Sequence, residues 1–425
     1  MKCLFVFQNH PPSFSYSGAA SRTAMDFASL AALGLELHVV RFLSNTARPD
    51  VAAHESARTG ETADIRARAA SWVDVDYTGT RRTHRLVARV VRSVRDPAAA
   101  AEPEVVRLAG VVRERFGALA PELVWSVGPL SGWIVGRAGP TVPWSATLTD
   151  WRFRLVRLRD RGAGWKGRAV TRWTSWTLRR ADVDFLGAST TAVTGSTLQA
   201  EDMRAFGARA VHVIPQGYPD ELGETDPSPP PGPPRIVHFG SLETTSNWLG
   251  MEAYLDRAHP ALRGRLDAAG AEAPLWVVGD LRRARPEVRR KLEAAGALCP
   301  GFVQDLGEAM RPFDVSIIPY EFPTGLRSKV PLLFSRAQAV VATEAAVGGM
   351  PELQGGDNCV LVRSVDEFPD AVGGLIERPD ERVRLGRAAR ATFEREFRLE
   401  SQRERYRAVL EGLGVAPPVA AATDG

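Results

Sequence analysis

The sequence has 425 residues, of which 44% are hydrophobic and 24% are charged. This length indicates two or three domains of roughly 100–200 residues each, and the composition is that of an ordinary soluble globular protein. The formal net charge of +4 is too small to indicate nucleic acid as the partner. The three cysteines, Cys3, Cys299 and Cys359, are widely separated and odd in number, so the sequence predicts neither a zinc motif nor a disulfide framework.

The beginning of the chain is apolar only from Cys3 to Phe7. A signal peptide needs an apolar region of about 7–15 residues, and a membrane-spanning helix needs about 20. We therefore expect a cytoplasmic protein whose membrane contact, where it occurs, is limited to the surface.

The first half of the chain has the pattern of a parallel α/β domain. Short apolar runs at residues 3–7 and 37–42 flank a segment, residues 18–33, whose apolar residues recur at helical spacing. This is the pattern of a βαβ unit with strands buried on both faces. Further strands are predicted at residues 123–127, 142–148, 184–188 and 210–214.

Residues 218–234 are acidic and Pro-rich, and they predict an extended linker. The α/β pattern then restarts, with strands predicted at residues 235–239, 275–278, 315–319, 340–343 and 359–362, helices at 251–255, 286–295 and 330–337, and one long helix at 380–412. We therefore predict two Rossmann-like, doubly wound parallel-sheet domains that face a cleft. The predicted divisions are residues 1–217, the linker 218–234, residues 235–395, and a C-terminal helix 396–413 packing back toward the first domain.

The loop after the predicted strand at 315–319 carries the strongest functional signal. Arg327 and Lys329 lie where the next helix begins, and Gly325 precedes them. Cations are unfavourable at the positive end of a helix dipole, so two of them there indicate a bound anion such as a diphosphate. Gly325 would let the backbone approach that ligand closely. The alternative is a solvated helix start with no ligand.

Several motifs in this half occur together in one known family. They are Gly240-Ser241-Leu242 followed by Asn247, the VVGD segment 277–280, the GFV segment 301–303 with Asp305, the strand from Asp314, the TGLRSKV segment 324–330, the VVAT segment 340–343 and the Gly348-Gly349 turn. The chain resembles the retaining GT-B glycosyltransferases of glycosyltransferase family 4, clearly over residues 235–400 and weakly over residues 1–220.

The resemblance implies a carbohydrate-biosynthesis enzyme that uses a nucleotide-sugar as co-substrate and needs no other cofactor and no metal. It implies that the acceptor is a small molecule, a glycan or a lipid-linked sugar, and that Arg327 and Lys329 neutralise the diphosphate and stabilise the leaving group. The implied donor-binding residues are Gly18, Gly240, Ser241, Asn247, Gly279, Glu321, Thr324, Gly325, Leu326, Arg327 and Lys329.

The chain departs from the family at two acidic positions. Family members commonly have two glutamates, one holding the sugar and one the ribose, and these positions are Thr324 and Leu332 here. Glu321 is the candidate replacement for the first. The departure leaves the sugar and the nucleotide open. It also supports an alternative function, a catalytically silent GT-B protein that binds a nucleotide or sugar or serves as a partner subunit.

Three polar features of the first half have competing interpretations. Asp150 follows a predicted strand and either orients or deprotonates an acceptor hydroxyl or caps a helix. His10 is more simply an exposed loop histidine than a site residue. The triplets Asp74/Asp76 and Asp182/Asp184 have metal-binding spacing, but exposed strand faces are the favoured explanation.

Two stretches are strongly basic. Residues 152–180 contain nine arginines, one lysine and a single acid, with Trp165, Trp173 and Trp176 interleaved, and residues 81–95 contain six arginines. Such helices can contact an anionic membrane or an anionic acceptor. Helices that merely cover the sheet are the favoured alternative. No nucleic-acid recognition motif accompanies either stretch, so we do not expect nucleic acid as a partner.

Overall fold

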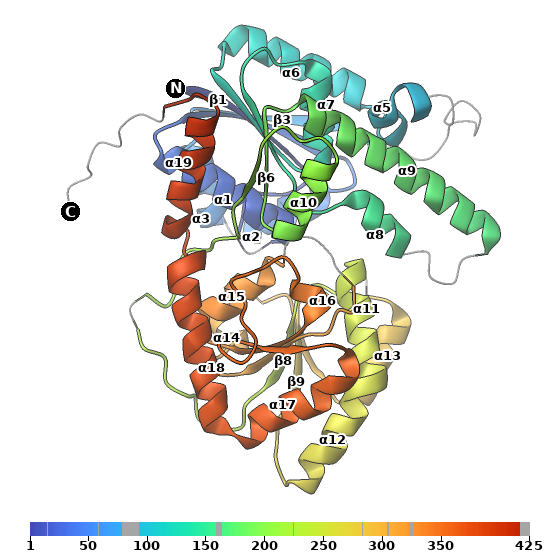
Figure 1. The fold of residues 1–425 in the computed structure, drawn as a ribbon, viewed down its shortest axis with the longest axis vertical. Coiled ribbons are helices and arrows are strands. Elements are labelled where there is room, and N and C mark those ends of the chain that lie inside the picture. Colours follow the sequence, from blue (N-terminus) through green and yellow to red (C-terminus); the bar gives the residue numbers. More distant parts are fainter. Residues whose placement is uncertain are drawn as a thin grey trace. The chain divides into compact units, whose positions relative to one another are not determined.

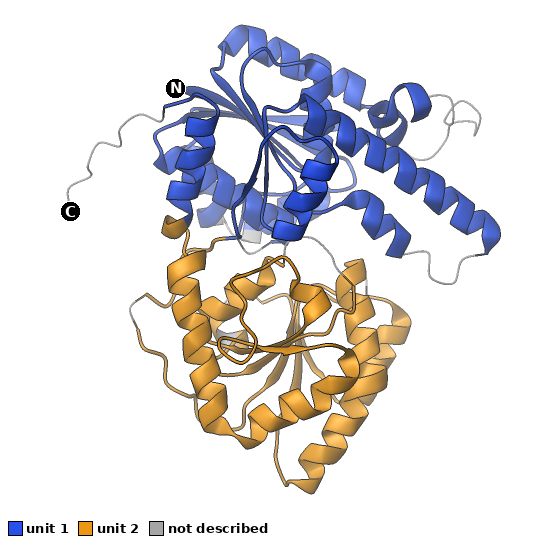
Figure 2. Ribbon diagram, viewed as in Figure 1, with its two compact units in different colours: residues 1–216, 402–425 blue, residues 217–401 orange. Residues whose placement is uncertain are grey.

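The computed structural model describes residues 1–14, 16–57, 59–78, 93–158, 164–223, 225–282, 284–303, 306–322 and 327–416. The chain forms two compact units, one of residues 1–216 with 402–425 and one of residues 217–401 (Figure 2). The second unit includes the Pro-rich stretch that the sequence predicts to be a linker. No helix within the described ranges is both long enough and apolar enough to span a bilayer.

The first unit is built on a parallel sheet (Figure 1), and its strand order is β3-β2-β1-β4-β5-β6-β7. The strands are β1 (Lys2–Gln8), β2 (Glu36–Ser44), β3 (Ser71–Tyr77), β4 (Leu123–Val127), β5 (Trp144–Thr147), β6 (Thr191–Thr194) and β7 (Val211–Val213). The apolar run from Cys3 to Phe7 is at most 1% exposed, because helices cover both faces of the central strands.

The helices of this unit connect successive parallel strands. They are α1 (Gly18–Ala32), α2 (Arg48–Ala57), α3 (Thr59–Ala67), α5 (Pro97–Ala101), α6 (Val105–Leu119), α7 (Pro129–Ala138), α8 (Arg152–Leu158), α9 (Trp165–Ala188), α10 (Thr197–Ala205) and, from the far end of the chain, α19 (Arg403–Gly412).

The strand predicted at residues 184–188 is wrong. Those residues form the last turns of α9, and the strand is β6, a few residues later. Leu178, Ala181, Phe185 and Leu186 are buried at helical spacing, so the apolar run continues an amphipathic helix. A short apolar run cannot be assigned to strand or helix by periodicity alone. Asp182 and Asp184 therefore do not lie on a strand face.

The single helix predicted at residues 380–412 is also wrong. It is divided into α18 (Pro379–Thr392), a π-helical turn (Phe393–Phe397), a 3₁₀ turn (Glu400–Gln402) and α19. The interruption has an identifiable cause, because Arg398 takes an extended conformation and the flanking backbone pairs with Tyr218. Tyr218 donates its N–H to the carbonyl of Phe397 at 2.9 Å and accepts from the N–H of Leu399 at 2.9 Å.

Helix α19 packs against α1 through a buried polar cluster. The Tyr406 hydroxyl donates to the carboxylate of Asp26, which also accepts from Trp125 Nε1 at 2.9 Å and pairs with Arg22 at 2.8 Å. These four side chains are at most 1% exposed. Since each charged or polar group has a partner, burial of the cluster is tolerated and fixes the end of the chain on the first unit.

The second unit has a parallel sheet with the strand order β10-β9-β8-β11-β12-β13. The strands are β8 (Ile236–Phe239), β9 (Leu275–Val278), β10 (Leu298–Gly301), β11 (Val315–Ile318), β12 (Ala339–Thr343) and β13 (Val360–Val362). Edge strand β10 was not predicted, because its sequence LCPG is short, exposed and contains proline. The order reverses between β8 and β11, and the carboxyl edge at such a point is where α/β sheets bind ligands.

The remaining elements of the second unit cover this sheet. They are α11 (Thr245–Ala253), a π-helical turn (Tyr254–Ala258), α12 (His259–Ala268), α13 (Pro286–Ala294), α14 (Leu306–Ala309), α15 (Lys329–Ser335), α16 (Glu344–Val347), a 3₁₀ turn (Val365–Glu367), α17 (Phe368–Glu377) and α18. The two strand orders confirm the prediction of two doubly wound parallel sheets.

Candidate functional site

Two glycines lie close together at the carboxyl ends of β8 and β9. Gly240 and Gly279 have φ angles of +128° and +146°, which side chains strongly disfavour. A Cβ on Gly279 would lie 2.6 Å from the carbonyl carbon of Gly240. A Cβ on Gly240 would lie 2.7 Å from Asn247 Nδ2 and 3.0 Å from Lys329 Nζ. Both positions therefore require glycine, which lets the two loop backbones, Asn247 and Lys329 pack closely against one another.

Ser241 and Asn247 hold the loop that follows Gly240. The Ser241 hydroxyl donates to the carbonyl of Asp280 at 3.1 Å, and Asn247 Nδ2 donates to the carbonyl of Ser241 at 2.7 Å. Asn247 lies in the first turn of α11 and is 7% exposed. Four of the predicted donor residues, Gly240, Ser241, Asn247 and Gly279, thus meet at one edge of the sheet.

The Lys329 ammonium lies beside these residues and has neutral partners. It donates to the carbonyl of Phe239 at 2.7 Å, to Asn247 Oδ1 at 3.0 Å and to the Tyr320 hydroxyl at 2.6 Å. The Tyr320 hydroxyl in turn donates to Asn247 Oδ1 at 2.8 Å. Burial, and secondly the positive charge of Arg327, lower the pKa of Lys329 well below its ordinary value.

Arg327 also lies against the Tyr320 ring. Its side chain is 6% exposed, and its Nε donates to the carbonyl of Ala346 at 3.0 Å. The guanidinium carbon of Arg327 is 4.5 Å from the centre of the Tyr320 ring, and Lys329 Nζ is 5.0 Å from it. The structure therefore brings the two predicted cations together around one aromatic ring.

Tyr320 lies at the end of the motif that begins with the strand from Asp314, but no role was predicted for it. It is fully buried, and a Cβ on Gly250 would lie 2.1 Å from its ring. The signal for it was its place directly after β11, at the edge where ligands bind. A buried tyrosine usually needs a partner for its hydroxyl, and here one partner is Lys329, which the sequence predicted as a site residue.

Glu321, the candidate replacement for a sugar-binding glutamate, has both carboxylate oxygens engaged. Arg257 Nη1 donates to Oε2 at 2.7 Å, and the Val365 N–H donates to Oε1 at 3.0 Å. Burial alone would raise the pKa of Glu321, but the hydrogen bonds from Arg257 and Val365 and the charge of Arg257 together outweigh burial and lower the pKa. Leu332, at the position of the second family glutamate, is 7% exposed on α15. Thr324, Gly325 and Leu326 lie outside the described residues.

In the first unit, α1 begins at Gly18, and Asp150 is half-buried after β5. The Ser17 hydroxyl caps α1 by accepting from the Ala20 N–H at 3.2 Å. The interpretation of His10 as an exposed histidine is wrong, because it is 8% exposed and its Nε2 is 2.7 Å from the Thr23 hydroxyl. Burial and the charge of Arg41 lower the pKa of His10 to about 3.

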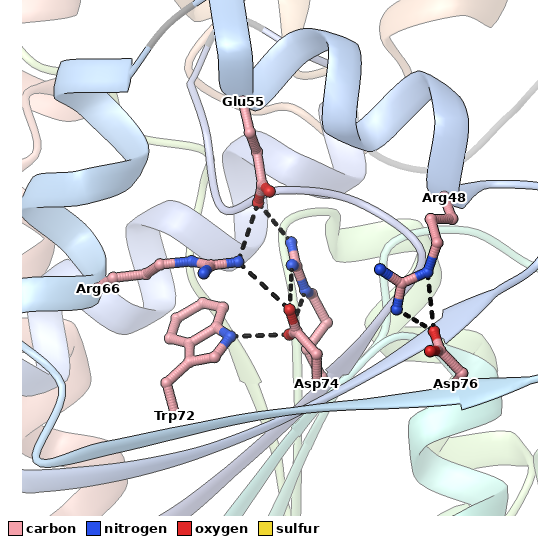
Figure 3. Close-up of polar contacts among 7 residues, drawn as sticks. Arg48, Glu55, Arg66, Trp72, Asp74 and Asp76 are labelled. Carbon is pink, nitrogen blue, oxygen red and sulfur yellow. Dashed lines mark hydrogen bonds and ion pairs between the residues drawn. The ribbon is translucent and has the colours of Figure 1, made fainter.

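The Asp74/Asp76 pair binds arginines (Figure 3). Asp74 accepts from Arg41 Nε at 2.8 Å and Nη2 at 2.7 Å, while Asp76 accepts from Arg48 Nε at 3.0 Å. Although partial burial opposes ionisation of Asp74, the hydrogen bond from Arg41 lowers its pKa. Across the described ranges, no three His, Cys, Asp or Glu side chains are grouped as metal ligands.

A cavity of about 490 Å³ opens beside the glycine-rich edge, between α13 and β10. Its walls include Asp280, Leu292, Ala297, Cys299 and Phe302. Asp280 joins it to the site above, since its carbonyl accepts from Ser241. The Phe302 ring is 48% exposed. This cavity was not predicted, because the short edge strand β10 that forms one wall has no recognisable sequence pattern.

Comparison with known proteins agrees with this geometry. Residues 233–378 match the family model "Glycosyl transferases group 1". Anabaena HepE in complex with UDP-glucose is 16% identical, with a TM-score of 0.63 over 97% of this chain and 99% of that one. Sucrose-phosphate synthase from Thermosynechococcus elongatus is 14% identical, with a TM-score of 0.67 over the same shares.

A further solved structure, the lipopolysaccharide outer core galactosyltransferase WaaB in its apo form, is 10% identical, with a TM-score of 0.59 over 97% of this chain and 99% of that one. A comparison with curated proteins finds no match. At these identities the structural likeness shows the fold. The chain therefore has a GT-B fold, and the stretch that matches the glycosyltransferase group 1 model lies within its second unit.

Proposed function

We propose that this protein transfers a sugar from a nucleotide-sugar donor to an acceptor hydroxyl, and that the donor diphosphate binds at the carboxyl edge of the β8–β11 sheet. One observation carries the proposal. The ammonium of Lys329 is buried among three neutral oxygens, with the guanidinium of Arg327 close by. Burying a charge without an opposite charge is costly, and such costs are typical of functional sites. A diphosphate would supply the missing negative charge.

The loop around Gly240 and Ser241 is the proposed place of the phosphates, because the absence of a side chain on Gly240 leaves the Lys329 ammonium packed directly against this backbone, where an anion beside it would be stabilised. The nucleoside would occupy the neighbouring cavity, where the half-exposed Phe302 ring offers a stacking surface. HepE, a protein of the same fold, was solved with UDP-glucose, so uridine nucleotides are the first donors to test.

The proposed chemistry breaks the bond between the anomeric carbon and the diphosphate oxygen and forms a bond from that carbon to the acceptor oxygen. Negative charge grows on the departing oxygen, where Lys329 and Arg327 stabilise it. These cations take the part that a divalent metal ion plays in other glycosyltransferases, and so we propose metal-independent transfer. Resemblance to glycosyltransferase family 4 supports retention of configuration, with the acceptor proton passing to the leaving phosphate on the same face.

Asp150 remains the proposed partner of the acceptor hydroxyl in the first unit, where it orients the hydroxyl or assists its deprotonation. The apolar Leu332 cannot hold ribose hydroxyls as a glutamate does. We therefore expect weaker discrimination of the ribose than in family members that carry the acidic residue.

The function is tested by incubating the purified protein with a panel of nucleotide-sugars and measuring release of the nucleoside diphosphate. The expected result is release from at least one donor, abolished in a Lys329→Met variant. Binding without release, even with a broad set of acceptors, would support a silent binding protein instead. Neither binding nor release for any donor would refute the proposal.

A further inference from the structure

Helix α9 exposes apolar side chains that its role in the fold does not require. Trp165 is 71% exposed, Val170 is 51% exposed and Trp176 is 38% exposed. The opposite face of the helix explains its packing, since Leu178, Ala181 and Phe185 are buried there. Covering the sheet therefore accounts for the inner face and the C-terminal half of α9, but not for an outward-facing tryptophan in its first turn.

The exposed face of the first four turns of α9 is also rich in basic side chains. Residues 164–180 include five basic side chains and no acidic one. Trp165, Arg168, Arg172, Trp176 and Arg179 follow one another at steps of three or four residues, which places them along one side of the helix. All five are exposed, and we call this row the Trp–Arg stripe.

Neighbouring contacts extend the stripe. Lys166 Nζ lies 5.5 Å from the Trp165 ring centre, and the guanidinium carbon of Arg180 lies 5.4 Å from that of Trp176. The Ser175 hydroxyl donates to the carbonyl of Phe153 at 3.0 Å, which fixes the basic helix α8 beside α9. The cations therefore surround the tryptophans on a surface held in place by the buried face of α9.

We propose that the Trp–Arg stripe binds the surface of an anionic lipid bilayer. Tryptophan side chains enter the boundary between headgroups and acyl chains, while arginines alongside them reach the lipid phosphates. The 71% exposed Trp165, an amphipathic ring of the kind enriched where membranes meet water, favours a bilayer as the occupant of the stripe. The inference stands apart from the donor site, because every residue of the stripe belongs to the other unit.

The direct test is flotation of the full chain with phosphatidylcholine vesicles and with vesicles that also contain phosphatidylglycerol. We expect binding only to the anionic vesicles, and release at about 1 M salt, where screening is nearly complete. Each cation near an anionic surface contributes roughly fivefold in partitioning, so Arg172→Gln with Arg179→Gln should weaken binding roughly 25-fold. Trp165→Ser should also weaken binding to the same vesicles.

Matched controls separate the stripe from general surface effects. Arg68→Gln with Arg115→Gln removes two exposed arginines from elsewhere in the first unit, and Leu198→Ser removes a 43% exposed apolar side chain from α10. These variants should float like the unaltered protein, and thermal unfolding should confirm that all variants are folded. Equal loss in stripe and control variants would overturn the proposal. So would absence of vesicle binding at low salt, equal binding to uncharged vesicles, or binding to RNA but not to vesicles.

Discussion

Replacing Lys329 with methionine is the change most informative about the donor site. Methionine retains much of the lysine stem, so the packing beside Tyr320 changes little while the charge is removed. Charges about 4 Å apart attract by about 4 kcal/mol at the effective dielectric constant of a protein surface. Removing one partner of a hydrogen-bonded charge pair commonly costs 2–5 kcal/mol. We therefore expect nucleoside-diphosphate affinity to fall by about 2–4 kcal/mol, or about 30-fold to 700-fold.

Isothermal titration calorimetry with UDP and then with other nucleoside diphosphates measures this change. Lys2→Met is the matched control, because it removes a lysine from the exposed start of β1 in the other unit. The control should bind as the unaltered protein does. If Lys329→Met bound a diphosphate as tightly as the unaltered protein, the reasoning about its uncompensated charge would be refuted.

Four further predictions concern the same sites. Burial and Arg327 lower the pKa of Lys329, so in the free protein the ammonium should lose its proton at a pH below the ordinary lysine pKa of about 10.4. A bound diphosphate should keep the ammonium protonated. Diphosphate affinity should then fall by up to about tenfold per pH unit as the pH rises above the lowered pKa. Calorimetry in buffers of different ionisation enthalpy should show that binding takes up a proton. Constant affinity from about pH 7 to about pH 10 would contradict this prediction. Tyr320→Phe removes an acceptor of the ammonium, so diphosphate affinity should drop roughly fivefold and its pH dependence should move to lower pH; calorimetry showing neither shift would remove the hydroxyl from the site. Gly279→Ala should lower the free energy of unfolding, measured by chemical denaturation, by about 2 kcal/mol or more, because Gly279 has a φ of +146° and contacts the adjacent backbone. The control Gly270→Ala, at a φ of +62° with open space around it, should lower it by about 1 kcal/mol. Equal losses would argue against a tight strand edge. Asp150→Asn should reduce turnover roughly a hundredfold while UDP affinity measured by calorimetry is unchanged, and full turnover would exclude it from the chemistry.

The sequence predicted the buried strands well, because continuous apolar runs such as Cys3–Phe7 mark strands covered on both faces. It failed where that signal is ambiguous or weak. Residues 184–188 belong to the amphipathic pattern of α9, and β10 is too short and exposed to show a pattern. The interruption after α18 depends on pairing with Tyr218, a contact between residues far apart in the sequence.

The candidate site could be predicted only in part for a similar reason. Gly240, Asn247 and Lys329 belong to recognisable motifs, and the structure brings them together. The neutral surroundings of the lysine and the link through Tyr320 are tertiary contacts that no local pattern records. The engagement of Glu321 by Arg257 is likewise set by residues distant in the sequence.

A crystal structure of the protein with bound UDP would test the central claim most directly. We predict diphosphate oxygens at about 2.7–2.9 Å from the Lys329 ammonium, the distance of a charge-assisted hydrogen bond, with the phosphates beside the backbone of Gly240 and Ser241. A diphosphate bound elsewhere, with the Lys329 ammonium still held only by Phe239, Asn247 and Tyr320, would contradict the assignment.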